Sequence, residues 1–254
     1  MVVLKANNIT KIYGGKDKAC STQALNGIDI SLNKGEFIGV MGPSGSGKST
    51  LLNIISGIDH ATTGSVEIEG KNICDLSSDE LSLFRRQKLG FVFQDFNLLD
   101  SLTLKENVML PMILDKKEPE FMDEKALIIM SLFEIDQIGE KYPHSVSGGQ
   151  QQRAAVSRSL VNDPAIVFAD EPTGNLDSKS SHAVMQMFTK MNNELETTIL
   201  MVTHDAFAAS FCKRIIFIKD GIVCMEIVNK GDRKEFFDRI LDCLAVIGGE
   251  KNDI

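Results

Sequence analysis

Short apolar runs of strand length alternate with amphipathic stretches of helix length along most of this 254-residue chain. The apolar runs lie at residues 28–32, 37–41, 65–68, 89–93, 166–169, 198–202 and 215–218. Those at 37–41, 166–169 and 198–202 lack clean alternation, as expected of strands covered on both faces of a parallel sheet. Helical patterns lie at residues 48–56, 123–133, 150–160, 180–193 and 206–212. This repetition of strand, turn and helix predicts an α/β fold built from βαβ units.

Two regions depart from the repeating pattern. The interval from about residue 95 to 163 shows helical patterns and no strong strand, so we predict a helical insertion in the α/β core. Near the end of the chain, apolar residues recur at helical spacing and predict an amphipathic helix; they are Phe236, Phe237, Ile240, Leu241 and Leu244. Its polar face is not strongly basic, so packing on its own domain is favoured over a membrane-surface role.

Composition limits the classes of function. The 27 Lys and Arg against 35 Asp and Glu give a net charge of −8, which argues against non-specific nucleic-acid binding. No stretch approaches the roughly 20 apolar residues that cross a bilayer, and the start lacks a signal-peptide core. The five cysteines are scattered without a Cys-x-x-Cys pair, so a reducing cytoplasm is expected. A partner that lies in the membrane remains open.

Residues 42–49 read Gly-Pro-Ser-Gly-Ser-Gly-Lys-Ser, which matches the phosphate-loop pattern between a predicted strand and a predicted helix. Glycines let the backbone wrap a polyphosphate, so that its N–H groups point inward at a helix N-terminus. Lys48 is expected to neutralise the β- and γ-phosphates, and the Ser49 hydroxyl to bind Mg²⁺. The predicted nucleotide-binding residues here are Gly42, Pro43, Ser44, Gly45, Ser46, Gly47, Lys48, Ser49 and Thr50.

The apolar run at 166–169 ends in the two carboxylates of Asp170 and Glu171. Asp170 is expected to hold Mg²⁺ and Glu171 to accept a proton from an attacking water. An acidic strand end by itself is more consistent with a solvated strand end than with a site. Its presence in one chain with the phosphate loop favours a site that binds and hydrolyses a nucleoside triphosphate.

A second loop of small residues, Ser147-Gly148-Gly149-Gln150, also precedes a predicted helix and presents backbone N–H groups at its start. With this loop the chain resembles the ABC (ATP-binding cassette) ATPases, in which it is the signature sequence. Val146 stands where the family usually has Leu. The resemblance covers residues 1–225.

The resemblance implies roles for further residues. Tyr13 corresponds to the aromatic residue that stacks on adenine, and Gln94 to the Q-loop glutamine that contacts Mg²⁺ and water. Asp177, in the segment Asn175-Leu-Asp177, belongs to the D-loop. His204 corresponds to the switch histidine that contacts the γ-phosphate, and with Lys48 and Glu171 it completes the expected catalytic set.

The family also implies an architecture and an assembly. The expected fold is a P-loop NTPase core with a mostly parallel sheet, an N-terminal antiparallel β-subdomain and an inserted α-helical subdomain. Residues 1–225 would form the ATPase domain and residues 226–254 a C-terminal amphipathic extension. ATP, with Mg²⁺, would lie between the phosphate loop of one copy and the signature loop of another in a head-to-tail homodimer.

Residues 94–108 and 170–177 resemble the subgroup that serves macrolide, lipoprotein and cell-division systems. The loop at 14–23 and the tail at 231–238 resemble ATPases of peptide-antibiotic resistance transporters of the bacitracin/nisin type in Gram-positive bacteria. This type implies a separate ten-helix permease, contact with a sensor kinase through that permease, and a location on the inner face of the cell membrane.

The contact with the permease is expected just after Gln94. Phe96, Leu98 and Leu99 are the candidate residues, and interior packing of the helical insertion is an equal alternative for each.

Three other functions remain as alternatives. The nearest is a lipoprotein-release, macrolide-export or cell-division ATPase. A soluble ABC ATPase acting on nucleic acid or ribosomes is disfavoured, because the chain shows no second cassette, coiled coil or iron–sulfur insertion. A nucleotide-gated regulatory scaffold without hydrolysis is disfavoured by the presence of Glu171 and His204.

Overall fold

The computed structural model describes residues 1–14 and 21–248, which form two compact units. The first unit comprises residues 1–76 and 200–254, and the second comprises residues 77–199. Part of the loop at 14–23 and the end of the chain after residue 248 therefore lie outside the described residues. No helix among the described residues is long and apolar enough to cross a membrane.

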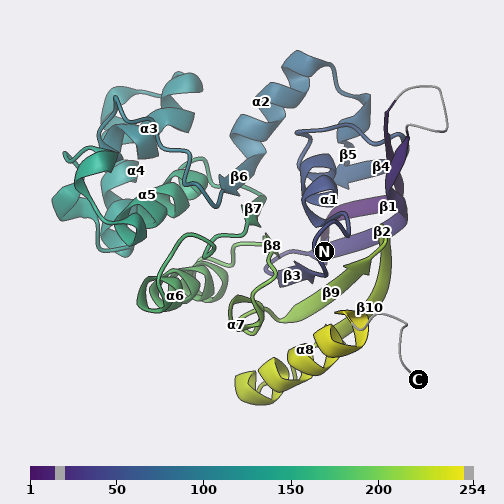
Figure 1. Cartoon of the computed structure of the whole chain (residues 1–254). Helices are drawn as coiled ribbons and strands as arrows, with labels where there is room; N and C mark the ends of the chain where they lie inside the picture. The colour runs from purple at the N-terminus through teal and green to yellow at the C-terminus, as the bar shows by residue number, and fades with distance from the viewer. Residues whose placement is uncertain (15–20, 249–254) are drawn as a thin grey trace. The chain divides into compact units, whose positions relative to one another are not determined.

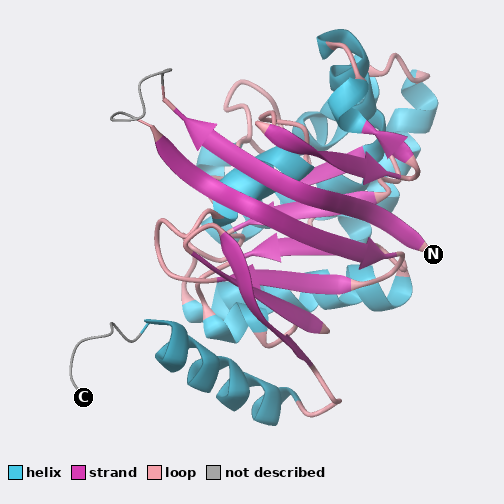
Figure 2. Ribbon diagram, turned by 90° about the vertical axis from the view of Figure 1, so that its right-hand side faces the viewer, coloured by secondary structure: helices cyan, strands magenta, loops and turns pink. Residues whose placement is uncertain are grey.

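The first unit contains an antiparallel sheet with the strand order β2–β1–β4–β5. Its long pair, β1 and β2, runs side by side from the N-terminus (Figure 2). A second group of strands in this unit has the order β10–β9–β3–β8, and β3 pairs with β9 in parallel. The bounds are β1 (Val2–Tyr13), β2 (Thr22–Asn33), β3 (Phe37–Met41), β4 (Thr63–Ile68), β5 (Lys71–Asn72), β8 (Ile199–Val202), β9 (Arg214–Lys219) and β10 (Ile222–Val228).

The described residues of the first unit form three α-helices. They are α1 (Lys48–Ile55), α7 (Ala206–Ala209) and α8 (Arg233–Gly248). The predicted C-terminal amphipathic helix is confirmed as α8, which buries Phe236, Ile240 and Ile247 and packs on α7. The Nζ of Lys219 donates to the carbonyl oxygen of Ile247 at 2.7 Å and so bonds the end of α8 to β9.

The second unit is mostly helical (Figure 1). Its parallel strands β6 (Leu89–Val92) and β7 (Ile166–Asp170) pair along four residues. Its helices are α2 (Ser78–Lys88), α3 (Leu104–Leu114), α4 (Pro119–Leu132), α5 (Gly148–Leu160) and α6 (Ser178–Glu194). Residues 95–163 contain no strand, and α3 packs against α4 and α5, so the predicted helical insertion is confirmed as a run of packed helices.

The predicted burial of the central strands is also confirmed. Every residue of β3 and β8 is buried, as is every residue of β7 before Asp170. The sequence pattern did not reveal β1, β5, β10, α2 or α3. The helix predicted at 206–212 is shorter, because the Oγ of Ser210 donates back to the carbonyl of Phe207 and the backbone N–H of Lys213 donates to Phe37.

Asn107 is a buried side chain that organises the start of α3. Its amide donates to the carbonyl oxygens of Leu99, Leu102 and Thr103 at 2.9–3.1 Å, and its Oδ1 accepts from the N–H of Leu99 at 2.7 Å. Thr103 and Glu106 add a capping box at the same helix end. One side chain therefore supplies hydrogen-bond partners for four backbone groups of the 99–103 loop.

We expect Asn107→Ala to lower the free energy of unfolding by about 2–3 kcal/mol, because it leaves buried backbone groups without partners. The measurement is the shift of the denaturant midpoint. Asn193→Ala, at an exposed position of α6, is the matched control and should change stability by less than about 0.5 kcal/mol. Equal shifts for the two variants would contradict the role given to Asn107.

Candidate nucleotide-binding site

The predicted phosphate loop lies in the first unit, between the end of β3 and the start of α1. Lys48 is buried, and its Nζ donates to the carbonyl oxygens of Gly42 and Pro43, both at 2.9 Å. The backbone of the loop thus surrounds the Lys48 ammonium group, and the loop holds a positive charge in its interior.

Two glycines of this loop are required by close backbone approach. Gly47 has φ +101°, and a Cβ there would lie 2.6 Å from the carbonyl oxygen of Ala24. A Cβ on Gly42 would lie 2.0 Å from the carbonyl oxygen of Ile218. Any side chain at either position would displace backbone, so the glycine pattern follows from the path of the loop.

The start of α1 suits an anion. Within the described residues, α1 has neither a side-chain N-cap nor an acidic residue in its first turn, so the helix does not supply its own partner for the free N–H groups. The Ser46 hydroxyl is buried and has no hydrogen-bond partner among the described residues. Backbone donors, a buried hydroxyl and Lys48 together fit a phosphate group, and the exposed Ser49 offers a hydroxyl oxygen for Mg²⁺.

Tyr13 and His204 belong to the same unit. The Tyr13 hydroxyl donates to Oδ2 of Asp59 at 2.8 Å, and the Nζ of Lys11 lies 4.7 Å from the centre of its ring. Burial acts to raise the pKa of Asp59, but hydrogen bonds from Lys11 and Tyr13 outweigh it and lower that pKa. His204 is exposed and follows the buried Thr203. The next residue, Asp205, caps α7 by accepting a hydrogen bond from the N–H of Phe207.

In the second unit, Gln94 and the D-loop are joined by hydrogen bonds. The Nε2 of Gln94 donates to Oδ1 of Asn175 at 3.1 Å, and the Nδ2 of Asn175 donates to Asp95 at 2.7 Å. A Cβ on Gly174 would lie 3.0 Å from Cδ of Gln94. The structure therefore brings the predicted Q-loop and D-loop into direct contact.

Gln152, a buried residue of α5, lies between these loops and the acidic strand end. Its Nε2 donates to the carbonyl oxygen of Pro172 at 2.5 Å and to that of Phe93 at 3.5 Å. Pro172 follows Asp170 and Glu171, and Glu171 adopts a left-handed backbone with φ +47°. The sequence prediction missed Gln152 and Asn175 as positioning residues, although Asn175 lay inside a recognised motif.

The signature residues form the start of α5. Ser147 is the N-cap, accepting from the N–H of Gln150 at 3.3 Å, and Oε1 of Gln150 accepts from the N–H of Ser147 at 3.0 Å. Asp177 caps α6 by accepting from the N–H groups of Lys179 and Ser180, and the bonds from the backbone and hydroxyl of Ser180 lower its pKa. A Cβ on Gly149 would lie 3.1 Å from Oγ of Ser180. The first turns of α5 and α6 are therefore in contact.

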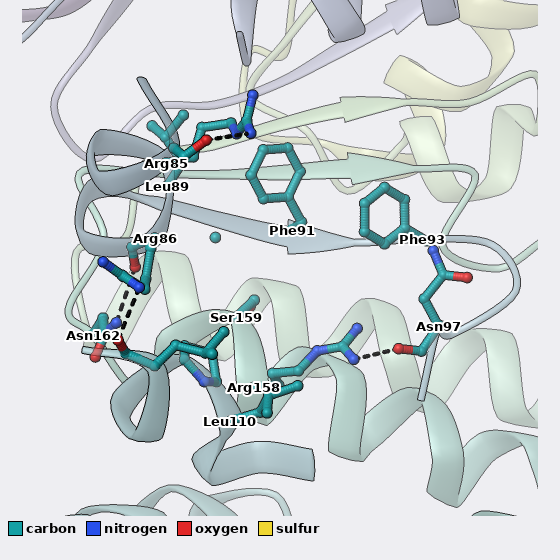
Figure 3. A pocket seen from close by; sticks show the side chains of 14 residues that line it. Arg85, Arg86, Leu89, Phe91, Phe93, Asn97, Leu110, Arg158, Ser159 and Asn162 are labelled. Atoms are coloured by element: carbon teal, nitrogen blue, oxygen red, sulfur yellow. Dashed lines mark hydrogen bonds between the residues drawn. The ribbon is translucent and has the colours of Figure 1, made fainter. Parts of the chain in front are cut away.

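A groove of about 390 Å³ lies beside this cluster, between α2, β6, α3 and α5 (Figure 3). Its lining includes Phe91, Phe93, Asn97 and Leu110. Phe96, predicted to contact a partner, does not line it and packs against the start of α5 instead, since a Cβ on Gly148 would lie 3.6 Å from Cζ of Phe96. Leu98 and Leu99 also lie outside the lining.

Comparison with known proteins agrees with these motifs. The family model described as "ABC transporter" matches residues 25–174. The bacitracin export ATP-binding protein BceA of Halalkalibacterium halodurans is 48% identical over 255 residues, which cover all of both chains. The uncharacterized ABC transporter ATP-binding protein YvcR of Bacillus subtilis is 51% identical over 98% of this chain and 96% of its own.

A solved structure gives the same result for the fold. The dimeric post-hydrolysis structure of the ATP-binding cassette MJ0796 of Methanocaldococcus jannaschii, bound to ADP and Pi, matches with a TM-score of 0.80. It is 43% identical and covers 90% of this chain and 100% of its own. The phosphate loop, the signature helix and these matches together show that the chain belongs to the ABC transporter ATP-binding family, whose members are ATPases.

Proposed function

We propose that this chain is the ATPase subunit of a peptide-antibiotic resistance transporter of the bacitracin/nisin type. The observation that carries this proposal is the match to BceA over the full length of both chains. The match to the MJ0796 cassette covers all of that cassette but only 90% of this chain. The present chain thus shares with BceA a part that the shorter cassette lacks. Relatives named for macrolide export and lipoprotein release keep those functions as alternatives.

The proposed subunit acts as a head-to-tail homodimer on the inner face of the cell membrane, with a separate ten-helix permease that contacts a sensor kinase. MJ0796 is dimeric in its solved structures, which supports this assembly. Each ATP would lie between the phosphate loop of one subunit and the signature residues of the partner subunit.

The residues divide the chemistry among them. Lys48 and the N–H groups of α1 hold the phosphates, and Tyr13 stacks on the base. Glu171 accepts the proton of the attacking water, and His204 senses the γ-phosphate. Ser49, Gln94 and Asp170 would hold Mg²⁺, which neutralises phosphate charge when bound.

We expect Glu171→Gln to retain ATP binding, to lower turnover by about 10²-fold or more, and to trap the dimer, because an amide cannot accept the proton. Phosphate release and size-exclusion chromatography with ATP measure these effects. Glu196→Gln is the matched control, since Glu196 has the same left-handed backbone, with φ +50° against +47° for Glu171. Turnover close to wild type in Glu171→Gln would refute the assignment.

The transporter class is tested with the chain's cognate permease, co-purified with it in lipid nanodiscs. Bacitracin or nisin should raise ATP hydrolysis severalfold over the basal rate, and a macrolide should not. The reverse order of response would favour the macrolide-export alternative and overturn the proposed substrate class.

The groove of the second unit is the proposed binding site of the permease. Leu114 lines it and is 55% exposed, whereas Leu127 on α4 is 51% exposed and does not line it. Leu114→Ser should weaken co-purification of the permease about tenfold through lost apolar contact, and Leu127→Ser should leave it unchanged. Equal behaviour of the two variants would place the contact elsewhere.

A further inference from the structure

Asp59 joins the end of β1 to the segment that follows α1. Its Oδ2 accepts from the Tyr13 hydroxyl at 2.8 Å, and its Oδ1 accepts from the Nζ of Lys11 at 2.7 Å. The Nζ of Lys11 also lies 4.7 Å from the centre of the Tyr13 ring, so the two side chains lie on the same side of the strand. One carboxylate therefore binds both of them.

These contacts keep Asp59 ionised. Burial acts to raise its pKa, but the hydrogen bonds from Lys11, Tyr13 and the backbone of His60 lower that pKa overall. The Lys11 side chain is only 12% exposed, so little water competes for its ammonium group. The Tyr13 hydroxyl thus donates to a charged acceptor, and such a bond is stronger than one between neutral groups.

The two contacts fix the Tyr13 ring in different ways. The bond to Asp59 anchors its hydroxyl end, and the ammonium group of Lys11 is attracted to one face of the ring. Tyr13 is nevertheless 42% exposed. A ring that is held at its tip and covered on one face leaves the opposite face for a stacked base.

Asp59 is itself fixed relative to the phosphate loop. The N–H groups of Ile58 and Asp59 donate to the carbonyl oxygen of Asn53, at 2.8 and 3.0 Å, so this turn is bonded to the end of α1. The eight residues of α1 begin at Lys48 and span about 12 Å. One short helix therefore carries the phosphate loop at its start and the partner of Tyr13 just beyond its end.

Resting on the role proposed for Tyr13, we infer that Asp59 is a positioning residue for nucleotide binding, which holds the Tyr13 ring ready to stack on the base. Without this carboxylate the ring is ordered only when the nucleotide binds, and ordering a free side chain costs affinity. A polyphosphate that has no base does not contact the ring and should not respond. Asp59 acts through Tyr13 on binding, and the hydrolytic step does not depend on it.

The test uses the purified full-length chain and compares ADP with inorganic tripolyphosphate, which has no base. In Asp59→Ala the dissociation constant of ADP, measured by calorimetry, should rise about five- to tenfold, as the loss of one charge-assisted bond predicts. The KM for ATP should rise by a similar factor while kcat stays close to the wild-type value. The inhibition constant of tripolyphosphate against ATP hydrolysis should not change.

Further variants separate the bond to Tyr13 from folding. Tyr13→Phe keeps the ring and removes the hydroxyl, so it should weaken ADP binding as much as Asp59→Ala does. The double variant should be no weaker than either single variant, because both changes remove the same bond. Asp59→Asn keeps an acceptor oxygen without the charge and should regain part of the affinity.

Thr63→Val is the matched control. It removes the hydroxyl contact between Thr10 and Thr63, at 2.6 Å, which also joins β1 to the segment after α1 but does not involve Tyr13. This variant should bind ADP like the wild type. Thermal unfolding confirms that each variant is folded, and Tyr13→Phe and Asp59→Asn keep the test valid if Asp59→Ala does not fold.

The position of the ring has its own measurement. The chain contains two tyrosines, so NMR of the protein labelled with ring-¹³C tyrosine reports on Tyr13 and Tyr142 alone. ADP should shift the Tyr13 signals of the wild type and leave those of Tyr142 in place. In ligand-free Asp59→Ala the Tyr13 signals should narrow and move toward those of a freely rotating tyrosine.

Three results would each overturn the inference: equal losses of affinity for ADP and tripolyphosphate in Asp59→Ala, additive effects of Tyr13→Phe and Asp59→Ala, or Tyr13 signals that do not respond to Asp59→Ala. Tyr13→Ala tests the proposed stacking itself. If it leaves ADP binding unchanged, the role proposed for Tyr13 fails together with the inference. If it weakens ADP binding while Asp59→Ala and Tyr13→Phe do not, the inference alone fails.

Discussion

The burial of the central strands is the constraint on which the site depends. β3, β8 and all but the last residue of β7 are buried, so these strands have no face on which a polar side chain could meet solvent. Strands of this kind can carry functional groups only where they end. The phosphate loop follows β3, Asp170 ends β7, and His204 comes two residues after β8. The chemistry is placed at strand ends because the core leaves it no other position.

The two helices that follow glycine loops, α1 and α5, differ in how their N-termini are capped. α1 has no side-chain cap and no acid in its first turn, whereas α5 begins with a reciprocal cap between Ser147 and Gln150. An uncapped helix start leaves its N–H groups to a ligand, and a capped one is satisfied before any ligand arrives. The start of α1 is thus open to a phosphate group, whereas the start of α5 already satisfies part of its own backbone.

The sequence predicted the buried strands and most helices because their apolar runs are continuous or strictly periodic. It missed β1, where register shifts and the left-handed Asn8 break the alternation, and β10, whose residues are mostly exposed. α2 was missed because it buries only Leu81 and Phe84, and α3 because Pro111 lies inside it. The motifs located the candidate site residues, whose roles remain proposals. Gln152 and Arg158 could not be found, because each donates to carbonyl oxygens of loops distant in sequence. Asn107 could not be found because its role depends on how the 99–103 loop folds around it.

The balance of charge shows why local placement matters more than the total. The chain carries a net charge of −8, yet three arginines line one groove whose described residues include no carboxylate. At physiological ionic strength, charges more than about 8 Å apart are largely screened, so a segment in the groove interacts mainly with these arginines. An acidic partner segment would be repelled by the molecule only weakly at a distance and attracted strongly on contact. Such a surface selects a partner by fit and local charge, not by long-range attraction to an anionic membrane.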